Sequence, residues 1–432
     1  MSLFGALDTA ISGLSSQSAA FGNISDNIAN SQTTGFKRVD TSFLDYLTTS
    51  TPTNNGSSAV VAVPQYVNTV QGAITQTDNP LALAISGQGF FAVSQTDGTA
   101  ASGTTFSPQQ YYTRAGDFEM NKDGYLVNSA GDYLNGWLAQ ANGTTDTAAL
   151  VPIQISQSIY QPVASGNVSL SANLPPGGNP TTGTPPAQAP ITSNVSVYDA
   201  QGQSHQLTLS FTSAGADSND WTLAVTDDQG NTIGTGAVTF SADGTLASVT
   251  QNGTTTSASG SAAALALSTV YPASGGGAQT ISLDLGSIGG TSGLTQFAAS
   301  GYTLGGISQD GVPPGSFSSV SLQSNGNVVV NYDNGQSRTV AQVPIATFAA
   351  PDALQSQNGA SFTATEDSGP ALMEAAGTNG AGTLATSSLE SSNVDIATEF
   401  SQLIVAQQAY SANAKTVTTA DTMMQSTLDM IR

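Results

Sequence analysis

A heptad pattern of apolar residues at both ends of the chain constrains the fold more than any other feature. Near the N-terminus, the pattern advances in alternating steps of four and three through Leu3, Leu7, Ala10, Leu14, Gln17, Phe21, Ile24 and Ile28. Near the C-terminus, the same spacing runs through Ile396, Phe400, Leu403, Gln407, Tyr410, Ala414, Val417, Asp421, Met424, Leu428 and Ile431. This spacing places one apolar stripe along a helix, as in coiled coils. The sequence therefore predicts a long amphipathic helix at each end.

Each predicted helix has to bury its stripe against something, because an isolated helix is marginal in water. The stripes can pair within one chain, parallel or antiparallel, or neighbouring copies can cover them. The pattern alone weights an intramolecular pair and an assembly about equally. Ser392 or Asn393 is the predicted N-cap of the second helix, and Asp395 in its first turn suits the helix dipole.

The middle of the chain has the composition of a β protein. It holds most of the 46 glycines, and only 8% of all residues are charged, which suits short strands joined by tight turns. Asp123-Gly124, Asn325-Gly326 and Asn334-Gly335 are predicted turns. Residues 31–70 look irregular and rich in threonine. The predicted fold class is multidomain α+β, with terminal coiled-coil helices and mainly-β domains.

Charge excludes several classes of function. The net charge is −22, and the stretch from Asp123 to Ser337 contains no Lys or Arg. A nucleic-acid binder needs a basic stripe, and an anionic membrane surface attracts basic segments. Neither is expected as a partner, and no membrane insertion or Sec-type signal pattern is expected. The basic pair Lys37-Arg38 is predicted either to meet acidic groups of a neighbour or to be solvated.

Catalysis is not expected either. The chain has one histidine, His205, and no cysteine. His205 lies in a strand-like stretch and is predicted to be a surface residue. Gly87 and Gly89 lack the third glycine of a dinucleotide site and are predicted to allow close packing of strands. No cofactor or metal is expected. Paired-carboxylate hydrolysis stays open, because the spatial pairing of carboxylates is not visible in a sequence.

Four ordered blocks of sequence resemble the flagellar axial protein family, which comprises rod, hook and hook-associated proteins. The first includes Asn27, Asn30, Thr34, Gly35 and Phe36; the second Gly89, Phe90 and Phe91; the third spans residues 112–127; the fourth includes Asn393, Val394, Asp395, Gln407, Tyr410 and Asn413. Each block is weak alone, but their order and placement are specific.

The resemblance implies a structural and self-assembling function. The large central insertion, and a segment at 197–211 that is similar to a hairpin of hook proteins, favour a hook subunit over a rod protein. Such a subunit is expected to form a flexible tubular polymer that transmits torque from rod to filament as a universal joint. Expected partners are further copies, rod and hook–filament junction proteins, the hook cap and the type III export apparatus. The expected location is extracellular, reached without a cleaved signal peptide.

Alternatives are a distal rod or hook-associated protein of the flagellum. An adhesin of the bacterial surface is the alternative from another class, and it would need a signal or an anchor. By position, the resemblance implies a helical core of residues 1–30 and 391–432 and a connecting segment of 31–70 and 361–390. It also implies a discontinuous inner β domain of 71–150 and 301–360 and an inserted outer β domain of 151–300.

Overall fold

The chain folds into two compact units. The computed structural model describes residues 3–51, 54–100, 103–140, 144–176, 189–215, 218–271 and 278–431. The first unit comprises Met1–Gln157, Ser318–Asn331 and Ser337–Arg432, and the second comprises Ser158–Phe317 and Tyr332–Gln336. Helices at both ends and β structure between them confirm the predicted fold class. Neither described helix is long and apolar enough to cross a membrane.

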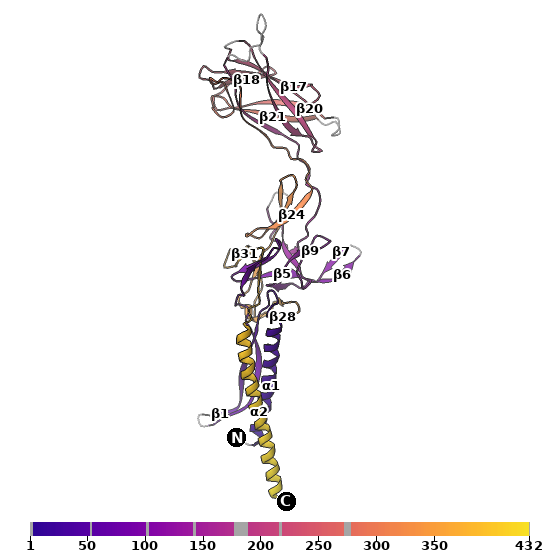
Figure 1. Cartoon of the computed structure of the whole chain (residues 1–432), viewed down its shortest axis with the longest axis vertical. Helices are drawn as coiled ribbons and strands as arrows, with labels where there is room; N and C mark the ends of the chain where they lie inside the picture. Colours follow the sequence, from indigo (N-terminus) through magenta and orange to yellow (C-terminus); the bar gives the residue numbers. More distant parts are fainter. Residues whose placement is uncertain are drawn as a thin grey trace. The chain divides into compact units, whose positions relative to one another are not determined.

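The helices of the first unit form a stem together with a long β-hairpin (Figure 1). The stem consists of helix α1 (Leu3–Ala29), helix α2 (Ile396–Ile431), and strands β1 (Val39–Thr51) and β2 (Asn54–Tyr66). The helices are antiparallel: Phe21 meets Tyr410 edge-on at 6.3 Å between ring centroids, and Asn27 contacts Glu399 near the other end of the pair. The sequence left open whether the helices pair within one chain and in which direction. In the structure they form an antiparallel pair within one chain.

Residues 39–51 and 54–66 pair as an antiparallel ribbon, with register shifts next to Leu47, so the prediction of an irregular segment was wrong there. A lone two-stranded ribbon is only marginally stable in water. Helix α1 supports it with hydroxyl groups. Ser12 Oγ accepts a hydrogen bond from the Val60 N–H at 3.1 Å, and Ser16 Oγ donates to the Val60 carbonyl at 2.7 Å. These hydrogen-bond partners are brought to the ribbon by the fold. The sequence of the ribbon itself therefore shows no periodic pattern that would predict them.

The α2 stripe that faces its own chain differs from the predicted one at several positions. The buried or half-buried residues along it are Glu399, Leu403, Ala406, Ala409, Asn413, Ala414, Val417, Ala420 and Met424. The predicted Gln407 and Asp421 are exposed, as are Ile396, Phe400 and Tyr410 at 43%, 50% and 42%. Small Ala406 and Ala420 let the helices approach, whereas Gln407 and Asp421 stay in water. The side chains of Leu3, Leu428 and Ile431 lie outside those described.

The predicted stripe of α1 turns inward over its described length. Ala10 and Ile24 are buried, and Leu7, Leu14, Gln17, Phe21 and Ile28 are half-buried. Gly13, which is not in the stripe, faces α2 closely. A Cβ atom added there would lie 2.8 Å from Asn413 Nδ2.

Helix α2 begins two or three residues later than predicted. The Asp395 Oδ1 atom accepts hydrogen bonds from the N–H groups of Ala397 and Thr398, at 2.9 and 3.2 Å. Asp395 is thus the N-cap, and the prediction of Ser392 or Asn393 was wrong. The Asn393 side chain is engaged elsewhere, because its Oδ1 accepts the Arg38 N–H at 2.8 Å.

The rest of the first unit is an inner β domain. Its largest sheet runs in the order β24-β25-β26-β11-β5-β8-β29-β28, with β9, β10, β12, β27 and β30 attached, and β3–β32, β4–β31 and β6–β7 form small separate pairs. A core of Phe90, Tyr112, Phe348 and Phe362 lies beneath it. Its elements are β3 (Ile74–Gln76), β4 (Leu83–Ser86), β5 (Phe90–Ser94), β6 (Thr96–Ala100), β7 (Gly103–Phe106), β8 (Tyr111–Thr113), β9 (Glu119–Met120), β10 (Leu126–Val127), β11 (Tyr133–Leu138), β12 (Val151–Pro152), β24 (Phe317–Leu322), β25 (Asn327–Tyr332), β26 (Ser337–Gln342), β27 (Ile345–Thr347), the 3-10 helix η2 (Pro351–Ala353), β28 (Gln355–Gln357), β29 (Ser361–Thr363), β30 (Leu372–Glu374), β31 (Thr383–Thr386) and β32 (Ser388–Glu390).

The second unit is a β-sandwich with its own apolar core. One sheet runs β14 to β19 in sequence order, and the other runs β20-β21-β13-β22, with β23 paired to β13. Inward residues alternate along the strands, as in β14 and β15. Its strands are β13 (Asn167–Asn173), β14 (Ile191–Tyr198), β15 (Ser204–Ser213), β16 (Asp220–Thr226), β17 (Thr232–Phe240), β18 (Leu246–Gln251), β19 (Thr254–Thr256), β20 (Ala262–Val270), β21 (Ala278–Ser287), β22 (Leu294–Thr295) and β23 (Thr303–Gln309).

Two predicted domain assignments differ from the structure. Residues 303–309 pair with β13 of the second unit, although the sequence placed 301–360 in the inner domain. Strands β29, β30 and β31 join sheets of the inner domain, although 361–390 was expected to be a connecting segment. Both segments are short and polar, and their strand partners lie far away in the sequence. The predicted turns are present, with Gly124, Gly326 and Gly335 at φ of 83°, 89° and 78°.

Candidate functional site

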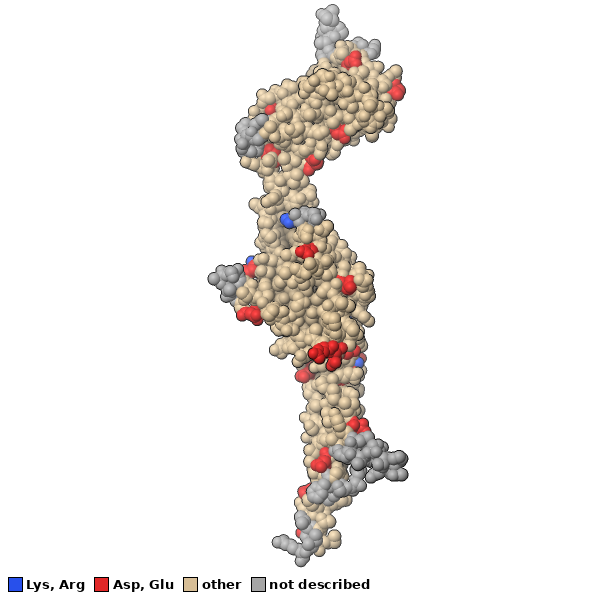
Figure 2. Space-filling model, turned by 180° about the vertical axis from the view of Figure 1, so that it is seen from behind, with Lys and Arg blue, Asp and Glu red and all other residues tan. Residues whose placement is uncertain are grey.

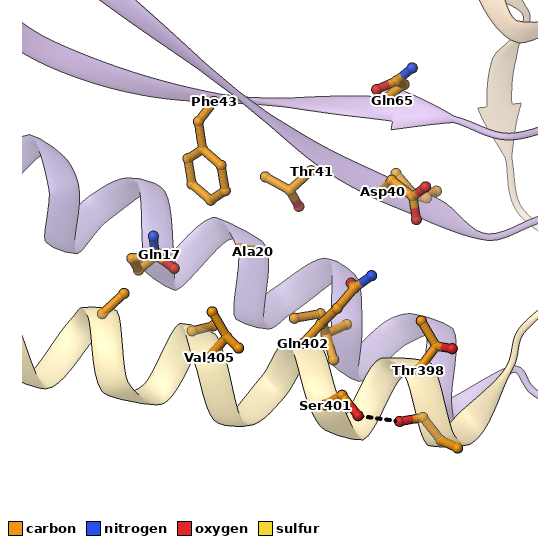
Figure 3. A pocket seen from close by; sticks show the side chains of 15 residues that line it. Gln17, Ala20, Asp40, Thr41, Phe43, Gln65, Thr398, Ser401, Gln402 and Val405 are labelled. Carbon is orange, nitrogen blue, oxygen red and sulfur yellow. Dashed lines mark hydrogen bonds between the residues drawn. The ribbon is translucent and has the colours of Figure 1, made fainter.

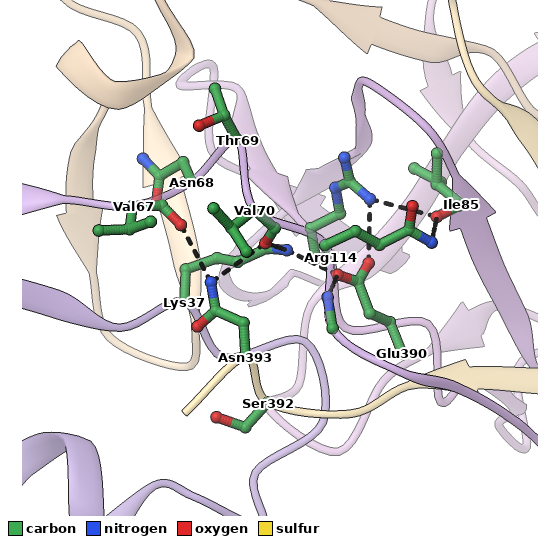
Figure 4. A network of polar contacts seen from close by, with 12 residues as sticks. Lys37, Val67, Asn68, Thr69, Val70, Ile85, Arg114, Glu390, Ser392 and Asn393 are labelled. Atoms are coloured by element: carbon green, nitrogen blue, oxygen red, sulfur yellow. Dashed lines mark hydrogen bonds and ion pairs between the residues drawn. The ribbon is translucent and has the colours of Figure 1, made fainter. Parts of the chain in front are cut away.

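A buried carboxylate, Glu390, ties the stem to the inner β domain (Figure 4). Its Oε1 atom lies 2.6 Å from Lys37 Nζ and accepts the Gly72 N–H at 2.8 Å. Its Oε2 atom lies 2.9 Å from Arg114 Nη1. Lys37 precedes β1, Arg114 follows β8, and Glu390 ends β32 just before helix α2. Three segments that are distant in sequence therefore meet at one side chain.

Burial dominates the electrostatics of this cluster. It lowers the pKa of Lys37, with nearby Arg114 adding to the effect and Glu390 opposing it. Burial also lowers the pKa of Arg114, and Glu390 again opposes. Arg114 donates further hydrogen bonds to the carbonyls of Ile85 and Gly87, at 3.2 and 2.7 Å. The ion pairs are thus supported by backbone partners that compensate part of the desolvation cost.

The basic pair Lys37-Arg38 is divided between two environments. Lys37 is buried inside its own chain, so both predictions for it, a neighbour's acid and a solvated side chain, were wrong. Arg38 is half-buried and its Nε lies 3.4 Å from Asp40 Oδ1. Consecutive residues of an extended segment point to opposite sides, which separates the two charges.

Two asparagines of the family blocks join the helices to the ribbon. Asn27 is buried; its Oδ1 accepts the Val39 N–H at 2.9 Å, and its Nδ2 donates to the Val39 carbonyl at 3.0 Å and to Glu399 Oε1 at 3.2 Å. Asn393 donates to the carbonyls of Val67 and Val70, both at 3.1 Å. Each amide satisfies backbone groups that the ribbon ends leave unpaired.

Glycines and aromatic residues of the blocks serve close packing. Gly35 has φ +70°, and a Cβ atom there would lie 2.3 Å from the Ala115 backbone nitrogen. A Cβ at Gly89, φ +119°, would lie 2.1 Å from Ile345 Cγ2, as expected of a packing glycine. Phe90 and Phe91 are fully buried beside these turns. The remaining signature residues are half-buried or exposed: Asn30, Thr34, Phe36, Val394 and Asn413 are half-buried, and Asp395, Gln407 and Tyr410 are exposed.

Glu399 is a buried acid in the first turn of helix α2, where it contacts Asn27 near the end of helix α1. Burial raises the pKa of its carboxyl group, and the Asn27 hydrogen bond opposes that shift. Its Oε2 atom is buried without a hydrogen-bond partner among the described residues. Glu399, Glu390 and Arg114 were not among the predicted site residues, although Arg114 lies in the third family block. In a chain with only 8% charged residues, an acid inside an apolar heptad, such as Glu399, is the signal that was available.

The stem has a groove between α1, α2 and β1 (Figure 3). The groove encloses about 790 Å³, and Ala20, Ile24, Phe43, Val405 and Ala409 are among its lining residues. The Phe43 ring points from the ribbon toward the helices, opposite Gln17 and Val405. Phe43 and Val405 are nevertheless 44% and 65% exposed. The groove is thus open, and apolar and polar side chains both line it, the polar ones including Gln17, Asp40 and Gln402.

His205, in the second unit, is buried in β15, so its prediction as a surface residue was wrong. Its ring stacks on Tyr271 at 3.7 Å, and its Nδ1 lies 3.0 Å from Asp228 Oδ2. Burial raises the pKa of Tyr271 to about 12. Among the described residues, no group of three or more His, Asp or Glu side chains is arranged to hold a metal ion.

Charge is sparse on the molecular surface. On the face shown in Figure 2, acidic side chains are scattered over the described surface and basic side chains are few. The net charge of −22 agrees with this distribution. A surface with so few basic groups offers few ion pairs to any partner.

Comparison with known protein families gives four matches in chain order. Residues 7–37 match flagella basal body rod protein, and residues 84–172 match the flagellar hook protein FlgE/F/G D1 domain. Residues 167–312 match the flagellar basal body protein FlaE D2 domain, and residues 385–430 match the flagellar basal body rod FlgEFG protein C-terminal family. The matched regions include most of both helices, the outer β domain and the N-terminal part of the inner β domain.

Individual relatives are similar over their whole length. The flagellar hook protein FlgE of Brucella abortus is 31% identical, and that of Rhizobium meliloti is 32% identical, each over all of both chains. The flagellar hook protein FlgE of Escherichia coli is 30% identical over 98% of this chain and all of its own. Among solved structures, Helicobacter pylori flagellar hook protein FlgE2 aligns with a TM-score of 0.49 at 16% identity, covering 73% of this chain and all of its own.

Proposed function

Since the chain belongs to the flagellar hook protein FlgE family, we propose that its stem holds it in a tubular helical polymer that bends as a universal joint between rod and filament. The protein is a structural subunit of the bacterial flagellar hook. The proposal adds how the subunit is held in place and what the polymer does mechanically.

One observation carries this proposal: the stem leaves apolar side chains on its surface after its own helices have paired. Along α2 these include Ile396, Phe400, Ile404 and Val405, and along the ribbon they include Phe43, Leu44, Tyr46, Val61 and Val63. Burying a large apolar side chain stabilises by roughly 1.5–3 kcal/mol. Apolar surface that is continuous along one element marks a protein interface. Neighbouring copies of the stem would cover it.

The rigid and compliant parts of the chain suit a bending polymer. Glu390, Lys37 and Arg114 lock the stem to the inner domain, while the outer β-sandwich is a separate compact unit. Separate units joined by short connections move relative to one another more readily than one packed core does. The subunit can then keep its stem contacts while outer contacts change during bending.

We also propose the finer location and partners that follow from membership of this family. The subunit is extracellular and travels through the type III export apparatus without a cleaved signal peptide. Its partners besides itself are rod and hook–filament junction proteins and the hook cap. Its role is structural and not enzymatic, which is supported by the packing role of the one histidine, His205, against Tyr271.

Electron microscopy and sedimentation of purified protein under polymerising conditions test the stem's role. The full chain is expected to form tubes. A variant that ends at Asp395 keeps the contacts of Glu390 and Asn393 but lacks helix α2, and it is expected to stay monomeric. A matched control, Leu304→Ser, removes an exposed apolar side chain from the second unit (45% exposed) and is expected to assemble normally. Tubes from the Asp395 variant would contradict the proposal.

A further inference from the structure

Helix α2 presents two different flanks on either side of the face that packs on α1. One flank carries Ile396, Phe400 and Ile404, which are four residues apart and therefore lie one above another. These side chains are 43%, 50% and 54% exposed and form the knob flank. The other flank carries Thr398, Gln402, Val405 and Ala409, which line the groove. Helix α2 thus has an exposed apolar flank on one side and borders the groove on the other.

The groove flank is completed by the ribbon. Thr41 and Phe43 of β1 line the groove, and alternate residues of a strand share a face, so Asp45 follows them on the same face. Asp45 is exposed and makes no ion pair among the described residues. The groove, whose lining also includes Asp40, is therefore continued along β1 by a second acid, Asp45.

Lys415 continues the knob flank toward the helix C-terminus. It lies about three helical turns beyond Ile404 and so points in nearly the same direction, at the edge of the flank, where it also lines a hollow with Ala412, Thr416 and Thr419. It is exposed and makes no ion pair among the described side chains. The chain also places Lys415 and Asp45 at similar heights. Gly13 faces Asn413, its neighbour Ser12 bonds Val60, and Val60 pairs with Asp45.

We propose that the knob flank of one copy docks into the groove of the next copy, with Lys415 meeting Asp45 across the contact. The inference rests on the proposed polymer and names the surfaces that form it. Ile396, Phe400 and Ile404 of one stem cover Phe43 and Val405 of the other. When two stems stand side by side at equal height, the apolar patches and the two charges are in register together.

The two flanks are different surfaces of one helix, so the contact is heterologous. A heterologous contact leaves a free knob flank at one end and a free groove at the other, and it repeats into a ring or an open helix. A self-complementary contact between two knob flanks would instead stop at a dimer. The geometry of α2 thus favours continued growth.

Charge exchange tests the pairing of Lys415 with Asp45 in the full chain. Lys415→Glu places two acids opposite each other, and we expect at least a tenfold loss of sedimentable polymer at low salt. The double variant Lys415→Glu with Asp45→Lys restores an attractive pair and is expected to recover assembly. Lys122→Glu, at an exposed lysine of the inner β domain, is the matched control and should assemble like the parent protein. Thermal unfolding of each monomer checks that the fold is intact.

Cross-linking tests the two surfaces directly, because the chain contains no cysteine. Polymer grown from an equal mixture of Ile404→Cys and Phe43→Cys chains is expected to give covalent dimers on mild oxidation. Polymer of either variant alone is expected to give none.

The outcomes separate this inference from the proposed function. If the parent chain forms no tubes, the polymer proposal itself fails, and this inference fails with it. If the parent forms tubes but Lys415→Glu assembles equally well and the mixed cysteine chains do not cross-link, only the docking inference is overturned. Dimers from Ile404→Cys alone would show a knob-to-knob contact and would also overturn it.

Discussion

At the scale of single residues, a few buried polar groups hold the first unit together. Glu390 joins two cations that are otherwise remote from solvent, Lys37 and Arg114. A buried ion pair adds little net stability over an apolar substitute, but breaking one leaves an uncompensated buried charge. The main effect of this cluster is therefore to fix the position at which helix α2 starts.

Glu390→Gln is expected to destabilise the first unit by about 3–5 kcal/mol, because it leaves Lys37 and Arg114 buried without a counter-charge. Urea unfolding followed by circular dichroism measures the change. Asp40→Asn is the control, since it removes a half-exposed partner of Arg38 and should cost less than about 1 kcal/mol. Equal effects of the two substitutions would refute the special role of Glu390.

From the raised pKa of Glu399 we predict that the free energy of unfolding depends on pH. Burial raises the pKa of this carboxyl group in the folded state, so the folded chain binds the proton more tightly than the unfolded chain. The stabilising contribution is complete below the unfolded pKa and is lost as pH rises through the raised folded value. Glu399→Gln lacks this titration. We expect the parent chain to lose stability relative to Glu399→Gln as pH rises above the ordinary glutamate pKa of 4.5.

Unfolding free energies of both proteins across that pH range check the prediction. Glu374→Gln serves as a control for a general pH effect, because Glu374 lies in the inner β domain away from the helix pair. If the difference between the parent and Glu399→Gln stays constant with pH, the carboxyl group does not titrate as the structure implies.

At the scale of elements, helix α2 depends on its first turn and on one face. Asp395 supplies the cap, and Glu399 with Leu403 and Ala406 begins the face that packs on α1. The opposite surfaces remain for other copies. Helix α2 has one face that packs inside the chain and two flanks that face outward. The single apolar stripe predicted from the sequence therefore did not match its buried face.

Removing the cap tests this view of the helix start. Asp395→Ala is expected to cost about 1 kcal/mol, because the N–H groups of Ala397 and Thr398 lose their acceptor. Hydrogen exchange at these two amides should accelerate roughly fivefold, since RT is about 0.6 kcal/mol. Asp395→Ser retains an acceptor and is expected to restore most of the protection. Unchanged exchange in Asp395→Ala would place the cap elsewhere.

At the scale of the whole molecule, the chain is two folding units with separate cores. The core of the second unit runs from Val168 to Leu294, and Ile307 of β23 packs against it. A sandwich of two sheets with a continuous core has what a domain needs to fold alone.

A fragment of residues 165–312 is therefore expected to fold by itself. Calorimetry should give one cooperative transition for the fragment and two for the full chain, one of them within a few degrees of the fragment's. A shorter fragment that ends at residue 300 lacks β23 and should melt lower, because β13 loses a partner strand. A fragment of 165–312 that shows no cooperative transition would mean that the outer unit depends on the rest of the chain.

Local features were predictable from sequence because their causes are local. Helices at both ends follow from heptad spacing, and the turns at Gly124, Gly326 and Gly335 follow from residues that tolerate positive φ. Membership of the flagellar axial family followed from four ordered blocks. His205 was predicted wrongly, because burial depends on what packs over a strand, and Tyr271, which follows β20, is far along the chain.

The sequence by itself determined that a helix forms at each end, that the middle is β structure, and which family the chain resembles. Only the tertiary structure decided that the terminal helices pair antiparallel, that residues 39–66 form a ribbon, and that Lys37 lies inside against Glu390. Spacing fixes which side chains share a face, but not what covers that face. The heptad ends thus predicted helices, whereas the partner residues brought by folding decided which side of α2 stays free.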